Sequence, residues 1–230
     1  MPANFFQRNP QLLALLSRWW IFWLGYGFLP SILTQQVGHF SNGNAGLWLL
    51  SSRLFVLVGG YFLISTREKG ALKQALVQPV TGRTLLQLLG LFGAILVLGM
   101  LSFTLVEQAL HLPVQQTIRQ VGENFLGQGV MVVLLAPLVE EAWFRHWLLG
   151  RVSSNKDALL WWGFMDGWQD VASIILFGLL HFSADYWGMK AFIWASVMGF
   201  FLLWVRRSTG SLTACIGLHA LHNGVLFFNG

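Results

Sequence analysis

The stretch Leu134-Leu-Ala-Pro-Leu-Val-Glu-Glu-Ala-Trp-Phe-Arg145 places two adjacent carboxylates, Glu140 and Glu141, at the end of an apolar run. Residues 130–139 carry no charge, so these acids lie in or beside hydrocarbon, where an ionisable group is a functional candidate by default. If the stretch is helical, Glu141 and Arg145 lie one turn apart and can form an ion pair, while Glu140 points elsewhere. The alternative is a purely structural ion pair between helices.

The composition is that of an integral membrane protein. The chain has 230 residues, of which 55% are hydrophobic and 10% are charged, and its mean hydropathy is +0.61. Too few polar residues are present to cover the surface of a soluble globule. The net charge of +5 comes from basic residues in short loops between apolar runs, so it does not indicate nucleic-acid binding. A single cysteine, Cys215, rules out an intrachain disulfide.

The apolar runs predict an all-α fold, a polytopic membrane helix bundle of about seven transmembrane helices in one domain, 1–230. The predicted spans are 12–33, 46–66, 84–106, 125–149, 170–187, 189–205 and 211–228. A cytoplasmic N-terminus places most Lys and Arg side chains on the cytoplasmic side. Residues 70–83 form a short basic interfacial segment in this scheme. Gly90, Gly93 and Gly99 predict close contacts of the third span with other helices.

Two further polar clusters interrupt apolar spans. His181 follows the run Phe177-Gly-Leu-Leu, and the last span contains His219-Ala-Leu-His-Asn223, with His219 and Asn223 one turn apart and His222 beside them. A lone histidine in a membrane helix usually packs through hydrogen bonds. Polar groups on three separate helices must find one another or water, however, which predicts one shared polar chamber.

The chemistry of such a chamber suits peptide-bond hydrolysis. A carboxylate in an apolar pocket can act as a general base at neutral pH, and imidazole and carboxamide N–H groups can stabilise an oxyanion. A zinc site made of His181, His219 and Glu140 stays open, although no H-E-x-x-H is present. Cys215 is expected to be a small packing residue. A proton-coupled transporter would show internal repeats, and none is visible.

The ordered set Glu140-Glu-x-x-x-Arg145, Phe177-x-x-x-His181 and His219-x-x-x-Asn223 resembles the three motifs of the CAAX protease and bacteriocin-processing (CPBP, or Abi) family. Thr209-Gly-Ser-Leu leads into the last motif. The resemblance covers residues 125–230, the expected catalytic core. It implies an intramembrane endopeptidase whose chamber opens towards the cytoplasm. The alternative is a non-catalytic membrane scaffold or bacteriocin-immunity protein of the same fold.

The resemblance also implies roles for the residues. Glu140 would activate a water molecule with the help of His181, while His219 and Asn223 would stabilise the oxyanion. The remaining pair, Glu141 and Arg145, would order the site. His146 departs from the family pattern, which often has a small residue there.

The expected surroundings follow from the same resemblance. No cofactor is expected, because a metal-independent glutamate mechanism is favoured over zinc. The expected partners are the lipid bilayer and a peptide or protein substrate, possibly lipidated or membrane-bound, and no nucleic acid. The expected location is the cell membrane, crossed several times. The physiological substrate does not follow from the sequence.

Overall fold

A computed structural model of the chain describes residues 66–110, 129–148, 168–182 and 186–229, together with residues 18, 20, 22 and 58. Helices and no strand occur in these residues, which confirms the all-α prediction for this part of the chain. The elements are α5 (Thr66–Val77), α6 (Gly82–Ala109), the π-helical turns η2 (Val130–Leu135) and η3 (Trp143–Trp147) on either side of α8 (Ala136–Ala142), α9 (Trp168–Leu179), α10 (Tyr186–Thr209) and α11 (Leu212–Asn229).

Two of these helices are long and apolar enough to cross a bilayer, namely α6 and the segment Gly188–Thr209 of α10. The first two predicted spans, 12–33 and 46–66, fall outside the described residues apart from a few isolated positions. The other predicted spans all contain helix, so the helical bundle is confirmed while the count of seven spans stays a prediction.

The predicted fifth span, 170–187, is wrong in its second half because α9 ends at Leu179. The amides of His181 and Phe182 bond to the carbonyls of Gly178 and Leu179, three residues back, so the last turn tightens and stops. The His181 ring also bonds the Phe177 carbonyl through Nδ1, at 3.1 Å. The His181 side chain thus hydrogen-bonds a carbonyl of the last turn of α9, where the helix ends.

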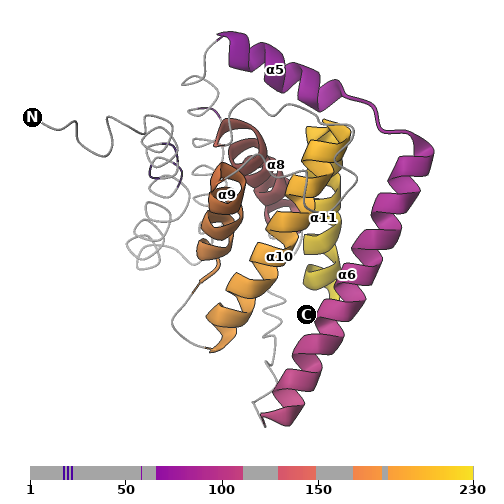
Figure 1. The fold of residues 1–230 in the computed structure, drawn as a ribbon, viewed down its shortest axis with the longest axis vertical. Helices are drawn as coiled ribbons and strands as arrows, with labels where there is room; N and C mark the ends of the chain where they lie inside the picture. Colours follow the sequence, from indigo (N-terminus) through magenta and orange to yellow (C-terminus); the bar gives the residue numbers. More distant parts are fainter. Residues whose placement is uncertain are drawn as a thin grey trace, which may run out of the picture.

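The helix α6 runs along one edge of the bundle, and α5 lies across the end of the bundle at which α6 begins (Figure 1). One stripe of α6, made of Leu88, Phe92 and Leu96, is buried, as the four-residue spacing predicts. Most of its other apolar side chains are exposed, which suits a helix with lipid on one side. In α5, Leu72 and Ala75 are buried while Lys73 is exposed, the pattern of the predicted interfacial segment.

The glycine prediction for α6 holds at one position of three. A Cβ at Gly99 would collide with the ring of Trp194 in α10, whereas a Cβ at Gly90 or Gly93 would meet no described atom within 4 Å. Gly99 lies seven residues after Phe92, two turns along the buried stripe, whereas Gly90 and Gly93 lie off that stripe. The described residues therefore provide no close contact at Gly90 or Gly93.

Two ion pairs hold α10 to its neighbours near its opposite ends. Near its last turn Arg207 donates to both carboxylate oxygens of Asp170 in α9, at 2.8 and 3.1 Å, and both side chains are buried. Near its first turn Lys190 lies 2.5 Å from Glu107 of α6, in a partly exposed pair. Arg207 lies beyond the predicted span 189–205, because α10 continues to Thr209.

Candidate active site

The acidic stretch lies in one continuous helix whose hydrogen-bond pattern changes twice. The amide of Ala136 bonds the Met131 carbonyl and the amide of Leu148 bonds the Trp143 carbonyl, each five residues back. Such π turns are common at functional sites because they re-aim the side chains that follow. Every residue from Val139 to Leu148 is buried, including Glu140, Glu141 and Arg145.

The predicted ion pair of Glu141 and Arg145 is present. Glu141 Oε2 lies 3.4 Å from Arg145 Nε, and both side chains are inaccessible to solvent. The other oxygen, Oε1, lies 2.9 Å from His219 Nδ1. Glu141 therefore joins the helix of the acidic stretch to α11.

The same imidazole also faces the second carboxylate. His219 Nε2 lies 3.7 Å from Glu140 Oε2, so His219 stands between the two glutamates, and all three side chains are buried. Both ring nitrogens of His219 therefore face carboxylates. The oxyanion role that the resemblance implies for His219 stays a prediction.

The Arg145 guanidinium is surrounded by α9 and α10. Its Nη1 donates to Ser173 Oγ at 3.3 Å, and Ser173 Oγ in turn donates to the Phe144 carbonyl at 3.2 Å. The guanidinium also lies over the Phe177 ring, 5.0 Å from its centroid. A Cβ at Gly199 would come within 3.4 Å of Arg145 Nη2. Sequence reasoning missed Ser173, for which a lone hydroxyl one turn before Phe177 was the only signal.

The remaining predicted imidazole, His181, contacts the same Phe177 ring as His219. The Phe177 centroid is 5.4 Å from that of His181 and 5.7 Å from that of His219. The His181 side chain is exposed and its Nδ1 faces the Phe177 carbonyl. The predicted cooperation of His181 with Glu140 stays a prediction.

The end of the third motif contacts the helix of the acidic stretch. Asn223 Nδ2 donates to the Val132 carbonyl of η2 at 2.9 Å, and Asn223 Oδ1 lies 3.0 Å from His222 Nδ1. His222 Nε2 accepts from the indole N–H of Trp194 in α10, at 2.7 Å. The sequence placed His222 beside the motif but gave no partner for it, and Trp194 was not singled out.

The Thr209-Gly-Ser-Leu sequence sets the start of α11. Gly210 has a φ of 71°, a conformation that favours glycine, and its amide bonds the Arg206 carbonyl. Ser211 Oγ then accepts from the Ala214 amide and caps α11. The turn is therefore short and defined, and it fixes where His219 falls along the bundle.

Two other residues raised by the sequence are buried near the site. Cys215 Sγ contacts the carbonyls of Leu202 and Ser211, so it is a packing residue, as predicted. His146, the departure from the family pattern, is buried in η3.

No group of three or more His, Cys, Asp or Glu side chains in the described part of the chain could hold a metal ion. Glu140 and His219 converge, whereas His181, the third ligand of the zinc alternative, contacts the Phe177 carbonyl through Nδ1. The choice between a metal-independent mechanism and zinc stays a prediction.

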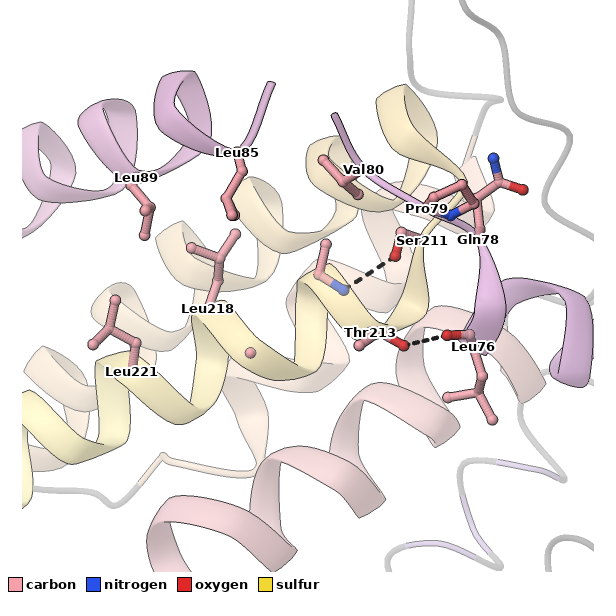
Figure 2. A pocket seen from close by; sticks show the side chains of 12 residues that line it. Leu76, Gln78, Pro79, Val80, Leu85, Leu89, Ser211, Thr213, Leu218 and Leu221 are labelled. Atoms are coloured by element: carbon pink, nitrogen blue, oxygen red, sulfur yellow. Dashed lines mark hydrogen bonds between the residues drawn. The ribbon is translucent and has the colours of Figure 1, made fainter. Parts of the chain in front are cut away.

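A separate groove of about 480 Å³ lies between α6 and α11. It is lined by apolar residues such as Leu85, Leu89 and Leu221, and Thr213 Oγ1 donates to the Leu76 carbonyl at its edge (Figure 2). With about 3.6 residues per turn, Gly217 and Leu221 fall on the face of α11 opposite His219. The groove is thus distinct from the carboxylate cluster, which consists of Glu140, Glu141, Arg145 and His219.

Comparison with known proteins agrees with the motifs. Residues 122–225 match the family model described as Type II CAAX prenyl endopeptidase Rce1-like. No curated protein and no solved structure gives a significant match. The matched region contains every residue of the carboxylate cluster, so the resemblance to the CAAX protease and bacteriocin-processing family is confirmed. Over residues 122–225, the chain is therefore similar to the Rce1-like family of type II CAAX prenyl endopeptidases.

Proposed function

We propose that this protein is an intramembrane endopeptidase that hydrolyses a peptide bond with a water molecule activated by Glu140. The observation that carries the proposal is the position of His219 between two buried carboxylates, 2.9 Å from Glu141 and 3.7 Å from Glu140, inside a domain of a protease family. The family and the two long apolar helices indicate a membrane protein. Several spans and a cytoplasmic N-terminus are part of the proposal.

Glu141 sets the protonation of His219 in this mechanism. A carboxylate 2.9 Å from Nδ1 favours the tautomer with the proton on Nδ1, as the buried aspartate does in serine-protease triads. The lone pair of Nε2 then faces Glu140. Arg145 holds the other Glu141 oxygen and is itself held by Ser173 and Phe177, so the carboxylate has one orientation.

The proposed reaction begins with a water bound at Glu140. The Glu140 carboxylate takes a proton as the water oxygen attacks the scissile carbonyl carbon. The proton then passes to the leaving amine nitrogen, directly or through His219 Nε2, as the carbon–nitrogen bond breaks. One water is consumed, and one carboxylate and one amine are produced.

Oxyanion stabilisation is assigned to groups other than His219. In this geometry His219 acts as proton carrier, because both of its nitrogens face carboxylates. Asn223 has two amide hydrogens, and Val132 takes one of them, so at most one is left for an oxyanion. His181, exposed beside Phe177, is the other proposed donor.

The proposed substrate is a peptide or protein at the membrane, lipidated or bound through its own apolar segment. The test is incubation of purified protein in nanodiscs with two peptide sets, prenylated peptides with a CAAX-type C-terminus and unmodified leader-type peptides, read by mass spectrometry. Site-specific cleavage that needs Glu140 supports the proposal. Absence of cleavage in both sets would favour the non-catalytic scaffold.

A further inference from the structure

Four groups from three elements form a hydrogen-bonded chain next to the carboxylate cluster. The Trp194 indole N–H lies 2.7 Å from His222 Nε2, His222 Nδ1 lies 3.0 Å from Asn223 Oδ1, and Asn223 Nδ2 lies 2.9 Å from the Val132 carbonyl. His222 is buried and Asn223 is half-buried. The chain joins α10, α11 and η2.

The two ends of this chain fix the direction of every hydrogen bond in it. An indole nitrogen can only donate and a backbone carbonyl can only accept. His222 Nε2 must therefore carry no hydrogen, and the Asn223 group facing Val132 must be its nitrogen. It follows that Asn223 Oδ1 faces His222, so Nδ1 must carry the hydrogen. Only neutral His222 with its proton on Nδ1 satisfies all three bonds.

The acceptor at the end of the chain needs a partner from outside its own helix. In an α-helical pattern the Val132 carbonyl would accept from the amide of Ala136, but that amide bonds Met131. In a π-helical pattern it would accept from residue 137, which is Pro137 and has no N–H. Asn223 supplies the missing donor. An apolar environment makes such a partner necessary.

We infer that Trp194, His222 and Asn223 form a hydrogen-bond relay with a single direction, which holds His222 in its Nδ1–H form. The relay also fixes the Asn223 amide on the Val132 carbonyl, which has no backbone donor because residue 137 is proline. His222 and Trp194 are therefore positioning residues for Asn223. The relay also ties the π turn η2 to α11, four residues beyond His219. Its role in turnover rests on the proposed function, whereas its hydrogen-bond direction does not.

The direct test is ¹⁵N NMR of histidine side chains in the full-length protein, with the His222 signals assigned by their loss in His222→Gln. The expected spectrum shows His222 with a protonated Nδ1 and an unprotonated Nε2, and this form should persist when the pH is lowered moderately. In Trp194→Phe this preference should weaken, while in Trp204→Phe, which changes an indole on the same helix outside the relay, it should stay. An Nε2–H form or an imidazolium in the wild type at neutral pH would overturn the relay.

Kinetics test the positioning role separately. Trp194→Phe and His222→Leu should lower kcat by about 10–100-fold, the range seen when a group that orients a functional ligand is removed, with KM nearly unchanged. His222→Gln keeps one donor and one acceptor and should recover part of the loss. Unchanged kcat in Trp194→Phe and His222→Leu would overturn the positioning role. If the wild type cleaves no peptide, the proposed function fails, and the NMR result alone decides the relay.

Discussion

The Glu141 carboxylate lies 2.9 Å from His219 Nδ1, and the two residues come from segments 78 positions apart in the chain. Because Arg145 holds the other Glu141 oxygen, this contact gives the His219 imidazole a defined orientation towards Glu140. The relationship converts an ion pair within one helix into a link between two helices.

Glu141 and Arg145 should behave as a coupled pair in unfolding. Glu141→Gln or Arg145→Met leaves a buried charge without its partner, which costs about 3–5 kcal/mol of the free energy of unfolding. The double variant should lose less than the sum of the single losses. Equilibrium unfolding in mixed micelles measures all three, and strictly additive losses would show that the two side chains are not partners.

The buried pair of Asp170 and Arg207 should matter more than the partly exposed pair of Lys190 and Glu107 near the other end of α10. Asp170→Asn leaves the Arg207 guanidinium buried with a neutral partner and should cost about 3–5 kcal/mol. The control is Glu107→Gln, which breaks the partly exposed pair with Lys190 and should cost about 0–1 kcal/mol. Equal losses in the two variants would contradict the assigned burial.

Gly99 and Gly93 form a matched test of the α6–α10 packing. Gly99→Ala places a methyl group into the Trp194 ring and should cost about 1–3 kcal/mol through overpacking. Gly93→Ala adds the same methyl group where no described atom lies within 4 Å and should change stability by less than about 0.5 kcal/mol. Thermal unfolding in detergent compares them, and a larger loss for Gly93→Ala would reverse the assigned helix face.

Activity should not depend on a bound metal ion. Glu140 and His219 converge, but no third ligand joins them among the described residues, whereas zinc catalysis needs three protein ligands and an open position. Protein dialysed against a chelator should keep its activity and contain well below one metal ion per chain. Stoichiometric zinc that is lost together with activity, and restores it on re-addition, would reassign Glu140 and His219 as ligands.

Local spacing in the sequence was enough to predict some of these features and not others. The pairing of Glu141 with Arg145 follows from a one-turn separation, and the meeting of the acidic stretch with His219 follows from the cost of isolated polar groups in hydrocarbon. The pairing of Trp194 with His222, 28 residues apart, and of Asp170 with Arg207, 37 apart, depends on how α9, α10 and α11 pack. No local pattern encodes that packing.

The placement of His181 shows a second limit. The sequence put His181 in the middle of a span, because the residues before it are apolar and helical. The helix nevertheless ends two residues earlier, with a tight turn that only the backbone hydrogen bonds reveal. The role of His181 as a helper of Glu140 comes from the motif alone and stays a prediction. In the structure the imidazole next to Glu140 is that of His219.

The most direct measurement of the central claim is the cleavage rate of Glu140→Gln in nanodiscs, with chelator present and Glu107→Gln as the matched control. Gln keeps the size of Glu140 and removes the base, so the rate should fall by about 10²–10⁴-fold, while the melting temperature stays close to that of the wild type. The control should cleave at the wild-type rate. Activity of Glu140→Gln within about tenfold of wild type would contradict the assignment of Glu140 as the residue that activates water.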